Sequence, residues 1–166
     1  MKKIFKLKLI VAIGIVLAAT FSASADTYTE ADAAKRTYLV PSDGELKGKK
    51  LLELSSPDLQ GTYRILCFAN TSYRLDISGD SQDNKANVQI WDSNQTFELY
   101  PTGGGYYRIK RNNKVLDVTN GQANPGTNVQ IYEWNGSDAQ QWKILKNDDG
   151  SFQSVSKLNE NLALDI

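Results

Sequence analysis

The sequence predicts an all-β fold, and three observations support that prediction. Apolar and polar residues alternate in short runs, as in 107–109 and 129–131, which is the two-residue period of a half-buried strand. Turn sequences such as Thr-Asn-Gly at 119–121 and Ala-Asn-Pro-Gly at 123–126 follow or precede these runs. Four short segments also recur in the same order along the chain, which indicates a repeated unit built from strands.

The repeated unit begins at Gly61. The matching segments are GTYRI at 61–65, GYYRI at 105–109 and GSFQS at 150–154; LDI at 75–77, LDV at 116–118 and LDI at 164–166; NVQIW at 87–91 and NVQIY at 128–132; and QTF at 95–97 and QQW at 140–142. These matches divide the chain into two full repeats, 61–104 and 105–149, and a partial third repeat, 150–166.

Short strands in units of about 40 residues fit either a propeller blade or one third of a β-trefoil. A propeller needs at least four blades, so the length favours the β-trefoil, a barrel closed by three such units. The third repeat stops roughly 20–25 residues before its siblings' spacing would complete it. We therefore expect an incomplete trefoil. Either the sequence is truncated, or residues 26–60 fill the gap, or another chain does. Truncation is favoured because 26–60 contains no Gln-x-aromatic triplet.

Residues 1–25 are predicted to be a secretory signal peptide. The segment starts with Lys2, Lys3, Lys6 and Lys8, continues as an 11-residue apolar run at 9–19, and offers the small-residue cleavage site Ala-Ser-Ala at 23–25. A membrane anchor would need roughly 18 or more apolar residues. The sequence thus predicts a secreted, extracellular protein without a membrane span after cleavage, and leaves 26–60 as an N-terminal segment of uncertain role. A secreted chain without a cysteine pair favours a bacterial source.

Composition excludes several chemistries. The 166 residues include no His and one Cys, so Ser-His-Asp and Cys-His catalytic sets, intrachain disulfides and Cys-rich zinc sites are excluded. Lys and Arg total 19, as do Asp and Glu, and removing the four lysines of 1–25 leaves 15 basic against 19 acidic residues. Nucleic-acid binding is not expected without a basic stripe, and we expect no cofactor or metal.

The closing triplets at 95–97 and 140–142 are each preceded, at nearly fixed spacing, by an LDI or LDV segment and a VQI-aromatic segment. In this pattern, residues 61–166 resemble the ricin-type β-trefoil lectin family, whose QxW repeat ends each unit. The resemblance implies that Phe97 and Trp142 pack in the barrel core.

The resemblance also implies a sugar site in each full repeat. Its carboxylates would be Asp76 and Asp117, its supporting amides Gln89 and Gln130, and its aromatic platforms Trp91 and Tyr132. The chemistry agrees, because a carboxylate can accept hydrogen bonds from adjacent sugar hydroxyls, each contributing ~1.5–3 kcal/mol. An aromatic face can pack against the apolar face of the sugar ring. A turn-capping role for the two aspartates is the structural alternative.

The two sites differ in sequence. The first has the Asn-Gln pair that the family places near the sugar, Asn94-Gln95, but a shorter connecting loop. The second has a full-length loop, with Ala139 before Gln140 in place of the asparagine. Trp134 either adds stacking there or covers the loop.

The sequence therefore predicts a non-catalytic, lectin-like module that binds glycans such as galactose-like or xylose-like sugars. It could accompany a toxin or a glycoside hydrolase as its targeting fragment. A trefoil scaffold repurposed for protein binding or inhibition is the main alternative. A glycosidase using Asp148 and Asp149 is disfavoured, because adjacent residues rarely converge on one bond. A calcium loop at 76–80 is set aside, since Ser81 and Asn87 replace the glycine and glutamate that it needs.

Overall fold

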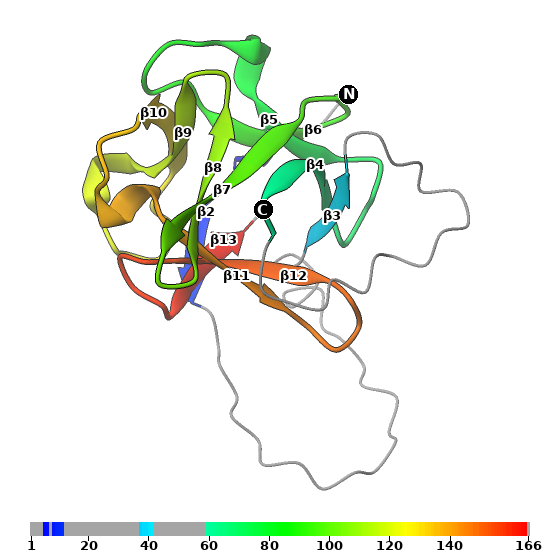
Figure 1. The fold of residues 1–166 in the computed structure, drawn as a ribbon. Helices are drawn as coiled ribbons and strands as arrows, with labels where there is room; N and C mark the ends of the chain where they lie inside the picture. The colour runs from blue at the N-terminus through cyan, green and yellow to red at the C-terminus, as the bar shows by residue number, and fades with distance from the viewer. Residues whose placement is uncertain (1–4, 7, 12–36, 42–58, 166) are drawn as a thin grey trace, which may run out of the picture.

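The computed structural model describes residues 5–6, 8–11, 37–41 and 59–165, with side chains described within 59–165 (Figure 1). The predicted all-β class is confirmed: thirteen strands of this part of the chain form one sheet, joined by turns and three short 3-10 turns. The predicted signal peptide and the segment 26–60 lie outside the described residues except for 5–6, 8–11, 37–41 and 59–60. Within the described residues, no helix is long and apolar enough to cross a bilayer.

The elements follow one another as β1 Phe5–Lys6, β2 Lys8–Val11, β3 Thr37–Pro41, β4 Gly61–Cys67, β5 Arg74–Ile77, η1 Ser78–Asp80, β6 Val88–Trp91, β7 Phe97–Gly103, β8 Tyr106–Arg111, β9 Lys114–Val118, η2 Thr119–Gly121, β10 Val129–Glu133, η3 Asp138–Gln140, β11 Trp142–Lys146, β12 Phe152–Ser156 and β13 Leu162–Asp165. The first repeat thus holds β4 to β7, the second holds β8 to β11, and the third holds β12 and β13.

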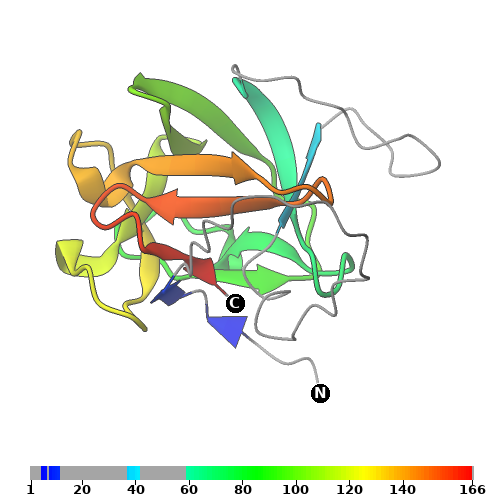
Figure 2. The ribbon, with the colours of Figure 1, turned by 90° about the horizontal axis from the view of Figure 1, so that it is seen from below.

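Six strands close into a ring of antiparallel pairs. β4 pairs with β7, β7 with β8, β8 with β11, β11 with β12, β12 with β3, and β3 returns to β4. The long β11–β12 hairpin crosses the view from below in Figure 2. The pairs β5–β6 and β9–β10 are additional hairpins, one in each full repeat. A closed ring leaves fewer strand edges exposed than an open sheet does.

The register of the two hairpins explains the repeated sequence. Asp76 lies opposite Gln89 in the first hairpin, and Asp117 lies opposite Gln130 in the second. Residues directly opposite each other on an antiparallel pair have side chains on the same face of the sheet. The thirteen-residue spacing read from the sequence is therefore a cross-strand contact, formed once in each repeat.

In the third repeat, strands from the N-terminal part of the chain occupy the remaining positions. β13 pairs with β2, and Asp165 lies opposite Lys8 as Asp117 lies opposite Gln130. β3 completes the ring, with Thr37 opposite Phe152, the register position that Trp142 has opposite Tyr107. The alternative in which 26–60 fills part of the gap therefore agrees with the placement of β3. Backbone pairing needs no Gln-x-aromatic triplet, which is why the sequence pattern did not reveal this strand.

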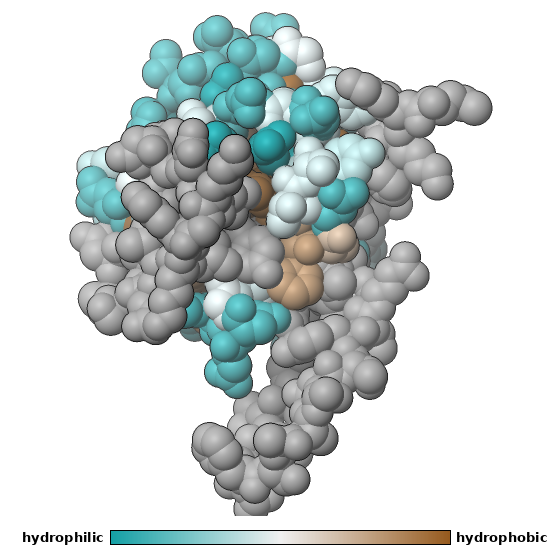
Figure 3. Space-filling view, turned by 90° about the vertical axis from the view of Figure 1, so that its right-hand side faces the viewer, coloured by the Kyte–Doolittle hydropathy of each residue, from teal (hydrophilic) through white to brown (hydrophobic). Residues whose placement is uncertain are grey.

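The core lies inside the ring and under the hairpins. Phe97 and Trp142 are both fully buried, as the family resemblance implies, and they pack among apolar residues from all three repeats. The indole N–H of Trp142 donates to the carbonyl of Leu116 at 3.4 Å, so its polar atom is satisfied as well. On the face shown in Figure 3, hydrophilic residues cover most of the coloured surface, with a smaller hydrophobic area near its middle.

A polar contact fastens β8 to the turn before β13. The hydroxyl of Tyr106 donates to Glu160, which also accepts from Lys143 at 3.2 and 3.3 Å. The hydrogen bond from Tyr106, followed by that from Lys143, lowers the pKa of Glu160 from its usual 4.5, and the same bond raises the pKa of Tyr106 above 10.0. Because the folded pKa of Glu160 is depressed, its contacts stabilise the fold above the unfolded pKa and are lost as the pH falls through the folded value.

Candidate functional site

A buried carboxylate with two amide partners forms the centre of the second repeat's candidate site. Asp117 lies near the end of β9 and is 7% exposed. Its Oδ1 accepts from Nε2 of Gln130 at 2.9 Å, and its Oδ2 accepts from Nε2 of Gln140 at 3.0 Å. A buried carboxylate needs such donors to offset its lost hydration. Each oxygen keeps a further lone pair with which it can accept from a ligand.

Gln140 is itself held in place by the loop that follows β10. Its Oε1 accepts from the backbone N–H of Asn135 at 2.8 Å, and its Nε2 donates to the carbonyl of Glu133 at 2.9 Å as well as to Asp117. Gln140 is fully buried at the end of η3. It therefore fixes the loop 133–139 and the carboxylate relative to each other, which keeps the site pre-organised.

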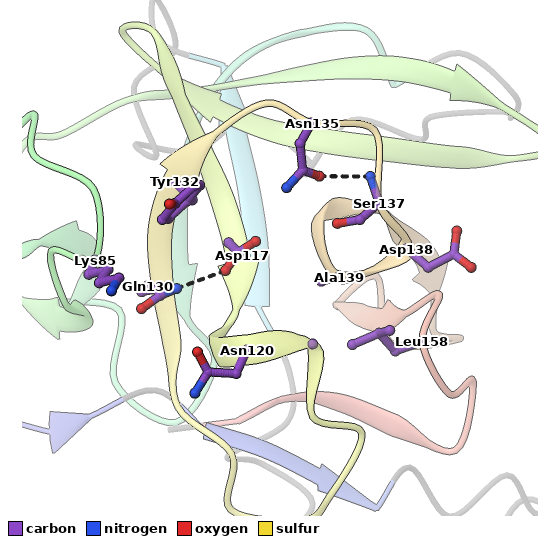
Figure 4. Close-up of a pocket in the computed structure, with 11 residues that line it drawn as sticks. Lys85, Asp117, Asn120, Gln130, Tyr132, Asn135, Ser137, Asp138, Ala139 and Leu158 are labelled. Carbon is purple, nitrogen blue, oxygen red and sulfur yellow. Dashed lines mark hydrogen bonds between the residues drawn. The ribbon is translucent and has the colours of Figure 1, made fainter.

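A pocket of about 410 Å³ opens over Asp117 (Figure 4). Its lining residues are Lys85, Asp117, Asn120, Gly121, Gln130, Tyr132, Asn135, Ser137, Asp138, Ala139 and Leu158. Figure 4 shows Asp117 between Lys85 and Gln130 on one side and the loop carrying Ser137 and Asp138 on the other. The pocket has the size and mixed polarity of a small-molecule site.

Tyr132 provides the aromatic side of this pocket. It follows Gln130 by two residues on β10, so both side chains leave the same face of the strand. Tyr132 is only partly buried and lines the pocket, whereas Ile131 between them is 1% exposed and belongs to the core. The structure thus brings together Asp117, Gln130, Tyr132 and Gln140, the four residues that the sequence assigns to the second site.

The first repeat keeps the carboxylate but connects its closing glutamine differently. Asp76 is 4% exposed and accepts from Nε2 of Gln89 at 2.8 Å. Gln95, the counterpart of Gln140, bonds to the backbone of Ile77, accepting from its N–H at 2.8 Å and donating to its carbonyl at 3.0 Å. Within 59–165, Asp76 therefore has one side-chain amide partner where Asp117 has two.

The short loop after Trp91 is hydrogen-bonded to Arg74 of β5. Arg74 donates to Oδ1 of Asp92 at 3.3 Å and to the carbonyl of Ser93 at 2.9 Å. Trp91 is partly buried, while Asn94 is exposed and has no hydrogen bond to Asp76 among the described side chains. The first site thus brings Asp76 and Gln89 together without a contact from Asn94 or Gln95. The shorter loop noted in the sequence is the physical cause of this difference.

Several pocket residues are not predicted by the sequence pattern: Lys85, Asn120, Asn135, Ser137, Asp138 and Leu158. Lys85 comes from the first repeat and Leu158 from the third, so spacing within one repeat carries no signal for either. Asn120 lies two residues after the LDV segment and adopts a left-handed φ of 56°, which asparagine tolerates better than most residues. This turn sequence is the one local signal that could have identified a pocket residue.

The other residues weighed from the sequence have local partners. Asp80, considered for calcium, accepts from Nε and Nη2 of Arg111 at 2.9 and 2.8 Å. Asp149 accepts from the N–H and hydroxyl of Ser151 in a surface turn. Trp134 is 37% exposed and lies 5.1 Å from the guanidinium carbon of Arg108, outside the pocket lining. The described residues contain no group of three metal-ligating side chains.

Comparison with known proteins supports this architecture. Residues 93–166, which include the whole Asp117 site apart from Lys85, match the family described as ricin-type beta-trefoil lectin domain-like. The resemblance predicted from the repeats is thereby confirmed. Among solved structures, the chain is similar to the designed threefold-symmetric protein ThreeFoil, at 22% identity and a TM-score of 0.55, covering 85% of this chain and 98% of that one. This likeness confirms the β-trefoil fold and nothing further. No curated protein matches the sequence.

Proposed function

We propose that this protein is a non-catalytic carbohydrate-binding module whose principal site is the Asp117 pocket. One observation supports the proposal above all others: a carboxylate fixed by two glutamine amides, next to a partly exposed tyrosine, in a pocket of about 410 Å³. Binding requires only these groups. Catalysis of glycosidic cleavage would require a second carboxylate acting across the scissile bond, and the other carboxylate of the pocket, Asp138, is held in an ion pair with Lys157 at 2.9 Å.

The pocket suits a single neutral sugar ring. Asp117 would accept from two adjacent hydroxyls, while Gln130 and Gln140 hold its oxygens in position. Tyr132 would pack against the C–H face of the ring, as aromatic surfaces do in sugar sites. Galactose-like and xylose-like sugars both meet these requirements. One such site is expected to bind with a Kd of roughly 1 mM, about −4 kcal/mol.

The Asp76 site is proposed as a second, weaker binding position. Its carboxylate has Gln89 as partner and Trp91 as candidate platform, but Gln95 is engaged by Ile77. With two sites on one chain, a polymeric glycan could engage both, and the apparent affinity would exceed that of either site alone. This arrangement would also suit the targeting part of a toxin or a glycoside hydrolase.

Retention on immobilised glycans tests the proposed function. The full-length protein is expected to elute late from at least one column carrying galactose- or xylose-containing polysaccharide, and free sugar should release it. Absence of binding across a broad glycan array, with a folded sample, would contradict the proposal and favour the protein-binding alternative. Release of product from chromogenic glycosides by the pure protein would contradict the non-catalytic assignment.

We further propose that residues 1–25 direct secretion and are then removed. The basic start, the apolar run and the small-residue site at 23–25 support this. In the full-length chain, β1 and β2 lie within this segment and pair with β6 and β13, so cleavage would expose those edges. N-terminal sequencing of protein recovered from the culture medium is expected to begin at Asp26. Exported protein that still begins at Met1 would contradict cleavage and favour a retained structural role for β2.

A further inference from the structure

Lys85 reaches the Asp117 pocket from a different repeat. It lies in the loop of the first repeat that leads into β6, yet it lines the pocket of the second repeat. In Figure 4 it sits beside Gln130, on the opposite side of Asp117 from Ser137 and Asp138. The position of this lysine is set by the contact between two repeats, and it is independent of the spacing that defines the other site residues.

Backbone and side-chain hydrogen bonds fasten this loop to β10. The N–H of Lys85 donates to the carbonyl of Ile131 at 2.8 Å, and the N–H of Ile131 donates to the carbonyl of Ala86 at 3.0 Å. Oδ1 of Asn84 accepts from the N–H of Glu133 at 3.1 Å, and Oδ1 of Asn87 accepts from Asn128 at 3.2 Å. The loop is therefore docked on both sides of Lys85, which holds the base of its side chain at the edge of the pocket.

The equivalent position in the second repeat has no side chain. Lys85 and Gly126 are 41 residues apart, the offset that relates Asn87 to Asn128, and both have left-handed backbones, with φ of 71° and 84°. Glycine adopts this conformation without steric cost, whereas a lysine adopts it only at a steric cost. The first repeat thus carries a long cationic side chain at a turn position where the second repeat has a glycine.

The charges around the pocket leave Lys85 available. Asp138 forms an ion pair with Lys157 at 2.9 Å, and Asp117 receives its two glutamine amides. Lys85 is exposed, and no ion pair involves it among the residues that the structure describes. A ligand seated on Asp117 would therefore meet a cation on one side that is not paired with any carboxylate of the described residues, while Asp138 across the pocket is paired with Lys157.

From this geometry we propose that Lys85 is a specificity-determining residue that makes the Asp117 pocket prefer acidic sugars, namely hexuronic acids. The sugar hydroxyls would bond to Asp117 while the C6 carboxylate pairs with the ammonium of Lys85. The ligand needs both its hydroxyls and its carboxylate, because an anion without hydroxyls would have nothing to donate to Asp117. The inference rests on the proposed carbohydrate-binding function and adds the class of sugar.

Two matched pairs of sugars test it: D-galacturonate against D-galactose, and D-glucuronate against D-xylose, which lacks the C6 carboxyl. Each is titrated into the full-length protein at about pH 7, where the uronate carboxyl is ionised. We expect the better uronate to bind roughly three- to ten-fold more tightly than its neutral partner at low salt, and the preference to shrink at high salt. Lys85→Gln should abolish the preference without weakening the neutral sugar, and Lys85→Arg should retain it.

Lys146→Gln is the matched control, because it removes the same charge from an exposed position on β11, outside the pocket lining. The control should bind every sugar as the unchanged protein does. An equal preference in Lys85→Gln and the unchanged protein, or equal weakening of uronate and neutral sugar by Lys85→Gln, would overturn the inference. Binding of neutral sugars alone would overturn it too, while leaving the proposed function standing. Binding of no sugar at all would overturn both.

Discussion

Asp117→Asn is expected to reduce sugar affinity at the second-repeat site by roughly 10- to 100-fold, with the fold retained. The change keeps the volume of the side chain but removes the charge, and a hydrogen bond to a charged group contributes about 1.5–3 kcal/mol. The asparagine oxygen can still accept from one of the two glutamines that bond Asp117. Titration with the preferred sugar, monitored by calorimetry or NMR, gives the affinity.

Asp148→Asn is the control for this variant, because Asp148 is exposed and lies outside the pocket lining. It carries the same change of charge and should bind sugar as the unchanged protein does. Asp117→Ala is less informative, since it leaves the amides of Gln130 and Gln140 without their buried acceptor and lowers stability by about 1–3 kcal/mol. Unaltered affinity in a folded Asp117→Asn sample would contradict the assignment of Asp117 as the sugar-contacting carboxylate.

Trp142→Ala is expected to have the largest effect on stability, lowering the free energy of unfolding by about 3–5 kcal/mol. Trp142 is fully buried at the start of β11, and its loss would leave a cavity and an unpaired carbonyl at Leu116. Because a domain of this size is stable by only about 5–15 kcal/mol, this loss would remove a large fraction of the total stability. Urea unfolding followed by circular dichroism measures the change.

Two further variants test whether the loss of stability comes from removing a buried aromatic ring rather than from removing any tryptophan. Trp142→Phe should cost less, because the first repeat carries Phe97, also fully buried, at the equivalent position. Trp134→Ala removes the same side chain from a site that is 37% exposed, and about 1 kcal/mol or less is expected. If Trp134→Ala destabilised the protein as much as Trp142→Ala does, the proposed arrangement of the core would be wrong.

The repeats made the fold predictable from the sequence. The matching offsets of the LDI, VQI and QxW segments define the length of the repeated unit. In the structure, the Asp and Gln of each full repeat lie opposite each other on neighbouring strands. The core positions of Phe97 and Trp142 are implied by the resemblance to the ricin-type lectin family, and both residues are fully buried. Local periodicity sufficed here because each hairpin is formed by residues close together in sequence.

Contacts between distant segments could not be predicted in this way. β3 enters the ring through backbone pairing with β4 and β12, and Thr37 occupies a register position that is aromatic in the other repeats. Lys85 reaches the second site because its loop docks on β10 from the neighbouring repeat. Neither contact leaves a sequence motif, because almost any residue can form backbone hydrogen bonds.

The difference between the two candidate sites also lies beyond the sequence pattern. Gln95 and Gln140 occupy the same position of their repeats, and the first repeat even has the asparagine that the second lacks. The short loop of the first repeat directs Gln95 to the backbone of Ile77, whereas the longer loop of the second directs Gln140 to Asp117. Loop length therefore decides which aspartate receives a second amide partner.

An NMR titration of the isotope-labelled protein with galactose and with xylose tests the central claim most directly. If the Asp117 pocket binds sugar, the amide signals of Asp117, Gln130, Tyr132 and Asn135 should shift together and saturably with at least one of them. Signals from the exposed 147–150 turn should stay in place. Saturable shifts confined to residues outside the pocket, or no shifts at concentrations well above about 1 mM, would contradict the account.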